Sequence, residues 1–340
     1  MKILIVTPYR NFSGGVESVN RMLQSLFEAD GHTVDYLTSE GPEHPRNTRI
    51  RLMKRVLGLP ALTACGYQDL AVGNYDLVLT NGEFGWGIEH PNAICLFHGS
   101  YRGLRDHLRR GLSWRHFISL SWQARIQRAA ARDKRVVAVS RFVAEILESQ
   151  GIRVTRVIEN CVDTDAFSPA AASAPAGRYL FVGSYHRYAK GFDVLEQLAR
   201  RGLQIDCVTD QHPGAPLGFL RSVSAGEMPA LYRRYRMLIF PSRFEAFGLV
   251  PLEAMSCGLP VLMLDVGIGR SLRAQLPEFV IAAGNSTPEE LANAFAARIP
   301  QIEARYDHYS NAARRYVLSR HSWSHFMQEW RRFAALGTPC

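Results

Sequence analysis

Short apolar runs alternate along this chain with longer stretches in which apolar residues recur at helical spacing, a pattern typical of α/β proteins. Such runs are characteristic of buried strands. In the first half of the chain the predicted strands span residues 2–7, 33–38, 76–81, 94–98, 136–140 and 154–159. In the second half they span residues 179–183, 203–209, 237–240 and 259–264. Because the pattern restarts partway along the chain, we predict two successive doubly wound domains.

The predicted boundary between these domains is residues 168–177, which are small, uncharged and rich in proline and alanine. This composition is typical of a linker. We therefore predict an N-terminal domain over residues 1–167 and a second domain over residues 178–318. Residues 319–340 carry a predicted amphipathic helix that needs a partner surface. The apolar face of that helix consists of Trp323, Phe326, Met327, Trp330, Phe333 and Ala334.

The segment 237–264 combines a strand, a loop, a short helix and a second strand. Pro251 is predicted at the first helical position, where its missing N–H costs nothing. Gly258 is predicted to end the helix as a left-handed residue. Glu253 would then lie in the first helical turn and Glu245 on the loop before it. The two glutamates would therefore not share a helix face.

The start of this helix also offers free backbone donors. The N–H groups of Gly248, Leu249 and Val250 are predicted to point outward between the two glutamates, with the helix dipole behind them. Such a helix start attracts anions, and the glutamates would accept hydrogen bonds from hydroxyl groups. The segment therefore predicts a cradle for a ligand that has both a phosphate and sugar hydroxyls.

Residues suited to binding also follow other predicted strands. Gly14 and Gly15 follow the first strand, where they allow either close backbone approach to a substrate or an ordinary tight turn. They do not form GxGxxG, so the dinucleotide fingerprint is absent. His98 stands where a strand emerges into a turn, a place for a functional histidine or a structural one. Arg187 and Lys190 follow another strand, and cations there suit a diphosphate.

The bulk composition is that of a globular protein long enough for two domains: 340 residues, 47% hydrophobic and 21% charged. The six cysteines are scattered without metal-like spacing, and we interpret them as reduced thiols of a cytoplasmic protein. The apolar run after Met1 is too short for a signal peptide. No run approaches the roughly 18 apolar residues that a spanning helix needs. We expect a protein that is neither secreted nor integral to a membrane.

The net charge of +9 is unevenly spread. Residues 101–135 hold ten Lys/Arg against only Asp106 and Asp133, so this segment carries +8. A second basic run covers residues 46–55. Both runs interleave their charges with Leu, Ile, Trp or Phe, which suits an anionic bilayer or a phosphorylated acceptor. A solvated arginine-rich surface has the same pattern, and the sequence leaves both interpretations open.

These residues together resemble the retaining glycosyltransferases of family 4. The strongest match is Glu245 to Glu253 in the context Pro-Ser-x-x-Glu-x-Phe-Gly-Leu-x-x-x-Glu-Ala-Met-x-x-Gly-x-Pro-Val. The resemblance implies an α/β chain with the GT-B fold: two Rossmann-like domains face each other across a cleft, and a C-terminal helix crosses back to the N-terminal domain. Supporting matches occur in family order: Gly14-Gly15, His98-Gly99, Val139-Ser140, Asn160-x-Val-Asp163, Lys190-Gly191 and Phe219-Leu-x-x-Val223.

The resemblance also implies roles for individual residues. The N-terminal domain would bind the acceptor and the second domain a nucleotide-diphosphate sugar, with Glu253 at the ribose and Glu245 at the sugar hydroxyls. The implied catalytic residues are His98, which reaches the donor sugar, Glu245, and Lys190, which neutralises the diphosphate. The implied donor-binding residues are Arg187, Lys190, Val223, Glu245, Phe247, Gly248, Leu249, Val250 and Glu253. The implied loop for the acceptor and leaving phosphate is Gly14 and Gly15.

The sequence departs from the family pattern near the nucleotide. Ser184 stands where the family has an arginine, for which Arg187 is the obvious substitute, and Arg221 replaces a usual glycine. Asp163-Thr-Asp165 matches a metal-binding DxD motif only superficially and fits the interdomain segment better. We therefore expect neither a metal nor a cofactor, because cations and a helix start can stabilise the leaving diphosphate. Retention by double displacement or by same-face attack stays open.

The sequence thus predicts a metal-independent hexosyltransferase that builds a cell-surface glycan or glycolipid, in the cytoplasm or at the inner face of the plasma membrane. A nucleotide-sugar epimerase or a phosphorylase of the same fold is an alternative. A basic nucleic-acid-binding module is another, but it would leave Glu245, Glu253 and His98 unexplained, so no nucleic-acid partner is expected. The sequence does not fix the donor base and sugar, the acceptor, the linkage or the oligomeric state.

Overall fold

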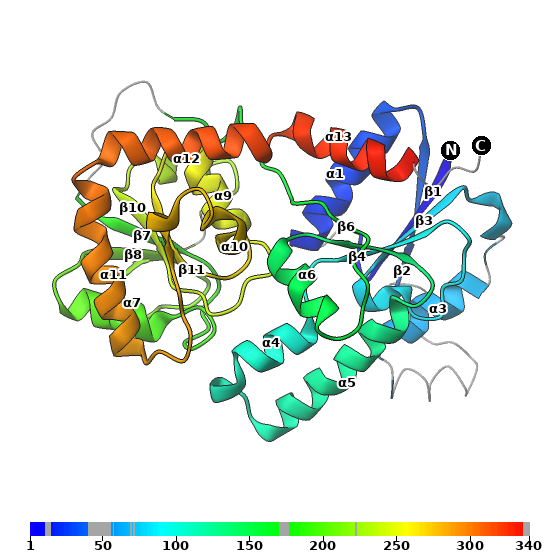
Figure 1. Cartoon of the computed structure of the whole chain (residues 1–340), viewed down its shortest axis with the longest axis horizontal. Coiled ribbons are helices and arrows are strands. Elements are labelled where there is room, and N and C mark those ends of the chain that lie inside the picture. Colours follow the sequence, from blue (N-terminus) through cyan, green and yellow to red (C-terminus); the bar gives the residue numbers. More distant parts are fainter. Residues whose placement is uncertain are drawn as a thin grey trace. The chain divides into compact units, whose positions relative to one another are not determined.

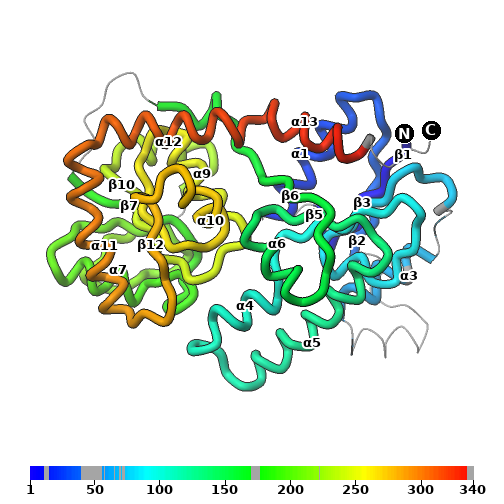
Figure 2. The backbone as a smooth tube through the Cα atoms, viewed as in Figure 1, coloured from blue at the N-terminus to red at the C-terminus, as the bar shows by residue number. Residues whose placement is uncertain are grey.

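In the computed structural model, the described residues are 1–10, 15–39, 56, 58–68, 70, 72–169, 177–221 and 223–335. The chain divides into two compact units (Figures 1 and 2). Unit 1 consists of Met1–Ile158 with Met327–Cys340, and unit 2 consists of Glu159–Phe326. The predicted boundaries at 167/168 and 318/319 stay predictions, and most of the predicted linker lies outside the described residues.

Unit 1 is built on a parallel sheet whose described strands follow the order β2-β1-β3-β4-β5-β6. They are β1 (Lys2–Thr7), β2 (Thr33–Thr38), β3 (Leu77–Asn81), β4 (Ala93–Phe97), β5 (Arg135–Ala138) and β6 (Arg156–Val157). The helices are α1 (Gly15–Ala29), α3 (Pro60–Gln68), α4 (Tyr101–His107), α5 (Trp114–Ala130), α6 (Arg141–Glu148), and the 3-10 turns η1 (Val72–Asn74), η2 (Gly82–Gly85) and η3 (Arg109–Gly111). The direction of winding reverses between β1 and β3, which makes this the switch point of the sheet.

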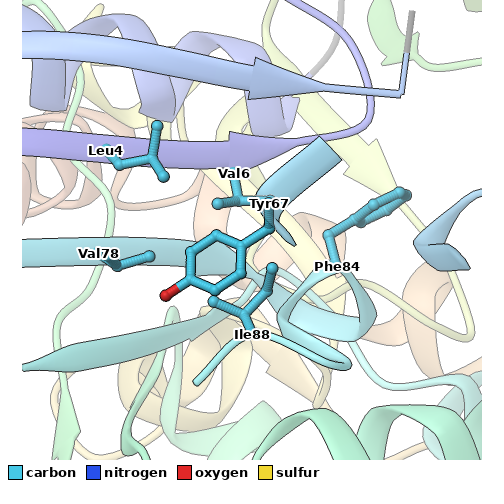
Figure 3. Packing of buried hydrophobic residues seen from close by; sticks show 6 residues of the cluster. All are labelled: Leu4, Val6, Tyr67, Val78, Phe84 and Ile88. Atoms are coloured by element: carbon cyan, nitrogen blue, oxygen red, sulfur yellow. The ribbon is translucent and has the colours of Figure 1, made fainter. Parts of the chain in front are cut away.

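The strands of unit 1 form because both faces of the sheet are covered. Ile3 and Ile5 point to one face and Leu4 and Val6 to the other, and all four are buried. Figure 3 shows Tyr67 of α3 packed against the second face with a cluster of apolar side chains. The cluster consists of Leu4, Val6, Tyr67, Val78, Phe84 and Ile88.

Unit 2 is built on a second parallel sheet, whose described strands follow the order β12-β11-β10-β7-β8-β9. They are β7 (Tyr179–Val182), β8 (Ile205–Val208), β9 (Gly218–Leu220), β10 (Met237–Phe240), β11 (Val261–Leu264) and β12 (Val280–Ile281). Its helices are α7 (Phe192–Arg200), α8 (Met228–Tyr232), α9 (Leu249–Ser256), α10 (Gly269–Leu272), α11 (Pro288–Glu303), α12 (Tyr306–Arg320), and the 3-10 turn η4 (Pro277–Phe279). Here the winding reverses between β7 and β10.

Helix α13 (Trp323–Ala335) begins in unit 2 and continues into unit 1 from Met327 onward. Within unit 1 it lies beside α1, as Figures 1 and 2 both show, and Arg331 pairs with Asp30 at 2.6 Å. Trp330 and Phe333 are buried there. The predicted return of the C-terminal helix to the N-terminal unit is therefore confirmed.

Candidate functional site

The first candidate site lies at the switch point of unit 2. Strands β7 and β10 pair in parallel, with Leu180 beside Leu238, so their carboxyl ends lie at the same edge of the sheet. The loop after β7 carries Lys190, and the loop after β10 carries Glu245. The structure brings these two predicted residues together, because Lys190 Nζ forms an ion pair with Glu245 Oε1. Both side chains are partly buried, at 23% and 16% exposed.

A second ion pair holds the two loops in register. Arg243, only 7% exposed, donates two hydrogen bonds to Asp193, at 2.7 and 3.0 Å. Its guanidinium also donates to the carbonyl of Tyr188 at 2.6 Å, and its backbone N–H to the carbonyl of Ala189 at 2.8 Å. The backbone just before Lys190 is thereby tied to the loop that carries Glu245. Sequence reasoning missed Arg243, because its partners are distant along the chain.

Gly191 makes this close approach possible. It has a φ of +73°, and a Cβ at this position would collide with the carbonyl oxygen of Pro241. Any other residue would therefore push the Lys190 loop away from β10. The glycine after Lys190 is a packing requirement of the site.

Helix α9 begins earlier than the sequence predicts. Gly248 is its N-cap in a left-handed conformation, with φ 100° and ψ 70°, and the first helical residue is Leu249. Pro251 is therefore not the first helical residue, and Glu253 lies beyond the first turn: both predictions were wrong. Gly248 lets the chain turn into the helix sooner, and Pro251 is tolerated because an N–H in the first turn has no helical acceptor. The helix ends at Ser256, and Gly258 follows its C-cap residue in a left-handed conformation, with φ +76°, as predicted.

The three residues of the predicted amide cradle lie at the start of α9. Within the described part of the chain, the N–H groups of Gly248, Leu249 and Val250 donate no hydrogen bond. They form the start of α9 and carry the positive end of its dipole. Phe247 differs from the other predicted residues, since its side chain is buried and packs against His321 with ring centroids 5.8 Å apart.

Glu253 is held by a tyrosine. The hydroxyl of Tyr232 donates to Glu253 Oε2 at 2.9 Å. Burial raises the pKa of Glu253 to about 7, although the hydrogen bond from Tyr232 opposes this rise. The carboxyl group is therefore poised between its neutral and charged forms near neutral pH, and a ligand hydroxyl that donates to it would favour the charged form.

The remaining predicted residues of unit 2 are Arg187 and Val223. Arg187 is 65% exposed, and its guanidinium pairs with Glu196 of α7 at 2.9 Å. Val223 is half-buried and follows β9, two strands from β7 in the sheet. Their roles toward the nucleotide stay predictions.

The second candidate site lies at the switch point of unit 1. Val6 of β1 lies beside Thr80 of β3, and Asn81 at the end of β3 lies beside Leu96 of β4. His98 follows β4 directly, and its Nε2 is 2.7 Å from Asn81 Oδ1. Burial lowers the pKa of His98 to about 4, so the imidazole is neutral at physiological pH. The sequence singled out His98 but missed Asn81, a polar residue that closes an apolar strand.

Asn81 continues into a buried chain of uncharged groups. Its Nδ2 donates to the Val6 carbonyl at 3.1 Å and to Asn20 Oδ1 at 3.2 Å. The Nδ2 of Asn20, on α1, donates in turn to Thr7 Oγ1 at 3.1 Å. Gly15 is the exposed first residue of α1, and Gly14 lies outside the described residues.

No group of three His, Cys, Asp or Glu side chains is placed to hold a metal ion in the described ranges. Asp163 instead caps a turn, since its Oδ1 accepts from the backbone N–H groups of Asp165 and Ala166, both at 3.0 Å. Among the residues that the structure describes, no helix is both long and apolar enough to cross a bilayer. The basic run 46–55 lies outside those residues.

Both halves of the chain are similar to known glycosyltransferases. A family model described as Glycosyltransferase Family 4 matches residues 13–166, and one described as Glycosyl transferases group 1 matches residues 176–299. The O-antigen chain mannosyltransferase B of Escherichia coli is 36% identical over 109 residues, which cover 32% of this chain and 24% of that protein. The GDP-mannose:cellobiosyl-diphosphopolyprenol alpha-mannosyltransferase of Xanthomonas campestris is 26% identical over 219 residues, 54% of each chain. The chain thus spans a quarter to a half of the length of these relatives.

The crystal structure of WaaG, a glycosyltransferase involved in lipopolysaccharide biosynthesis, superposes with a TM-score of 0.69 at 17% identity, over 99% of this chain and 100% of that one. Two Rossmann-like units in one chain, with a helix that returns from the second to the first, define the GT-B class of proteins. Within that class, the chain belongs to glycosyltransferase family 4.

Proposed function

We propose that this protein transfers a hexose-type sugar from a nucleotide-diphosphate sugar to a glycan or glycolipid acceptor during synthesis of a cell-surface polysaccharide, with retention of configuration and without a metal. The observation that carries the proposal is the Lys190–Glu245 pair at the switch point of unit 2, at the same sheet edge as the start of α9. The names of the two mannosyltransferase relatives support a surface glycan as product.

The chemistry follows from the charges at this edge. When the bond from sugar to diphosphate breaks, negative charge grows on the leaving phosphate. Lys190 supplies a positive charge, and the amides of Gly248 to Val250 supply donors that are already oriented. Glu245 and Glu253 then hold hydroxyl groups of the sugar and the ribose. In this arrangement the glutamates bind and position the donor and do not act as an acid–base pair.

The test of the donor site is a thermal-shift screen of nucleotide-diphosphate sugars, because a ligand that binds the folded state raises its apparent stability. We expect at least one sugar nucleotide to raise the melting temperature of the wild type and to have no effect on Glu253→Ala. The matched control is Glu303→Ala, because Glu303 also accepts a hydrogen bond from a tyrosine, Tyr179, at 2.9 Å, near the start of β7. A donor-induced rise in melting temperature that persists in Glu253→Ala would contradict the proposed donor site.

Product analysis of the donor that binds separates the candidate reactions. Proton NMR detects free sugar and its anomeric configuration. Slow release of free sugar that keeps its original anomeric configuration would support retaining transfer. Conversion into another sugar nucleotide would identify an epimerase, and sugar phosphate formed only with added phosphate would identify a phosphorylase. Binding of nucleic acid that is lost at moderate salt, without any response to sugar nucleotides, would identify a basic binding module.

We further propose that the protein acts in the cytoplasm at an anionic membrane surface, which it contacts through residues 101–135. Helix α5 exposes Trp114, Ile118 and Trp122, at 69%, 57% and 41%, and their spacing places them on one helix face. The same helix carries Arg115, Arg125 and Arg128, and the combination of arginines with exposed apolar side chains suits the interface of an anionic bilayer. The buried thiols of Cys95, Cys207 and Cys257, which form no disulfide, agree with a reducing compartment.

Sedimentation with lipid vesicles tests this surface. We expect binding to vesicles that contain phosphatidylglycerol and none to pure phosphatidylcholine, and we expect the double variant Trp114→Ser/Ile118→Ser to lose it. Leu318→Ser is the control, because Leu318 is also exposed, at 45%, but lies on α12. Equal vesicle binding by the double variant and the wild type would contradict the proposal.

A further inference from the structure

The hydrogen-bonded chain from Val6 to His98 has a fixed direction. A backbone carbonyl only accepts, so the Asn81 atom at 3.1 Å from the Val6 oxygen must be Nδ2. The other end of the amide, Oδ1, therefore faces His98. Since Oδ1 also only accepts, the Nε2 of His98 at 2.7 Å from it must carry the proton.

Burial strengthens this assignment. Asn81 is 4% exposed and Asn20 is 2% exposed, and the second bond of Asn81 Nδ2 runs to Asn20 Oδ1 at 3.2 Å. If the Asn81 amide turned over, its Oδ1 would face both the Val6 carbonyl and the Asn20 oxygen, and two buried acceptors would lose their donor. The amide is thus held in one orientation by two independent partners.

We infer that Asn81 is a positioning residue that holds His98 as its Nε2–H tautomer, so that Nδ1 is a hydrogen-bond acceptor for a hydroxyl group of a bound sugar substrate. In the described part of the chain Nδ1 has no hydrogen-bond partner. His98 is partly exposed and follows β4 at the carboxyl edge of the sheet, where ligands of doubly wound domains bind. The choice of a hydroxyl as ligand rests on the proposed function, but the tautomer does not.

The tautomer of His98 determines how the imidazole recognises a sugar hydroxyl. An acceptor at Nδ1 takes a hydrogen bond from a sugar hydroxyl, whereas an Nδ1–H would donate one to that hydroxyl and so reverse the direction of the bond. A sugar that lacks the matching hydroxyl leaves Nδ1 unpaired in the complex and is expected to bind more weakly. Asn81 therefore contributes to sugar selection without touching the sugar.

The first experiment is NMR of the ligand-free wild type labelled with ¹⁵N at its histidine rings. The chain has 11 histidines, and the His98 signals are identified as those that vanish in His98→Gln. We expect a proton on Nε2 and a bare Nδ1. A proton on Nδ1, or an equal mixture of the two tautomers, would overturn the inference, and the proposed function would be unaffected.

The second experiment compares Asn81→Ala with Asn92→Ala. Asn92 precedes the same strand β4 at its other end, and it also makes two side-chain hydrogen bonds, to the Asp76 carbonyl at 2.7 Å and from Arg135 at 2.6 Å. We expect Asn81→Ala to give averaged His98 tautomers and to lower kcat/KM about 10- to 100-fold, as the loss of a hydrogen-bond partner by a buried polar group does. Asn92→Ala should leave both unchanged.

Asn20→Ala provides a graded variant that keeps the Val6 carbonyl as partner of Asn81. We expect it to retain the wild-type tautomer and to lower kcat/KM only a few-fold. In the wild type, a sugar nucleotide that binds should shift the Nδ1 resonance of His98, as a new hydrogen bond does. The inference fails, and the proposed function stands, if donors bind and react but two quantities stay unchanged. These are the Nδ1 resonance of His98 on donor binding and the kcat/KM of Asn81→Ala relative to the wild type. If no donor binds, the proposed function fails.

Discussion

The two switch points are organised by opposite means. At the edge of unit 2, charged groups meet in pairs: Lys190 with Glu245, and Arg243 with Asp193. At the edge of unit 1, His98 ends a chain of amides and hydroxyl groups without a charged member. Both arrangements are partly or wholly buried, so each fixes its residues in one geometry.

This difference indicates which kind of ligand group each edge is suited to bind. Paired charges near the start of a helix suit a charged ligand group, because the lysine can turn from its glutamate to a phosphate without being desolvated anew. An uncharged chain brings no net charge to the ligand, but it sets the direction of each hydrogen bond and so suits hydroxyl recognition. Substitutions at either edge test this difference.

The largest effect is expected from Lys190→Met. It removes the partly buried cation of the proposed diphosphate site and leaves Glu245 without its partner. We expect kcat to fall about 100- to 1,000-fold, as when a preorganised electrostatic group is lost. Steady-state kinetics with the donor identified above would measure it.

Arg178→Met is the matched control for this variant. Arg178 precedes β7 and pairs with Asp206 of β8, so it is also a cation paired with an acid, but it lies at the amino edge of the same sheet. Its loss should lower stability without changing kcat. If both variants lost activity equally, the effect of Lys190 would be one of folding and the charged edge would have no special role.

A smaller effect on turnover, but a larger one on stability, is expected from Arg243→Met. This change leaves the partly buried Asp193 without its partner and frees the backbone before Lys190. Breaking a buried pair costs about 3–5 kcal/mol of unfolding free energy, measurable by urea denaturation. We expect KM for the donor to rise more than kcat falls, since Lys190 itself remains. Unchanged donor KM would show that the clamp serves stability alone.

The smallest effect concerns the pH dependence of donor binding through Glu253. Its pKa of about 7 lies above the ordinary 4.5, so folding disfavours its charged form and the unfolding free energy falls as pH rises from 4.5 to 7. Ligand hydroxyls favour the carboxylate, so donor affinity should rise with pH. At a pKa of 7 the charged fraction changes about tenfold between pH 6 and pH 8, and affinity should follow.

Isothermal titration calorimetry across this range would measure the change. His98, with a pKa of about 4, does not titrate in this window. Glu253→Gln should bind the donor with an affinity that is independent of pH. A pH dependence that survives in Glu253→Gln would assign the titration to another group.

Sequence patterns predicted most of the fold because burial on both faces leaves a clear signal. Strands β1, β2 and β10 begin and end at the predicted residues. Helix α12 was missed because only Tyr309, Ala313, Tyr316 and Val317 mark its buried face among many polar residues. The start of α9 was misplaced because Gly248 turns the chain before Pro251 is reached.

The candidate sites were predicted where the family motif names residues, and missed where the fold alone brings residues together. Lys190 and Glu245 were expected to share a ligand, and they form a direct ion pair. Asn81 and Arg243 carry no motif, and their partners lie far away in the sequence. An isolated asparagine or arginine gives no local signal of such a partner.

Helix α13 has a consequence for the order in which the protein matures during synthesis. Trp330 and Phe333, buried in unit 1, lie more than 150 residues after its last strand, β6. While the ribosome makes unit 2, unit 1 therefore lacks α13 and exposes the apolar surface that this helix covers. Unit 1 is made first, but its folding is completed last. Limited proteolysis of ribosome-stalled chains should find unit 1 more sensitive before residue 335 has emerged than after it.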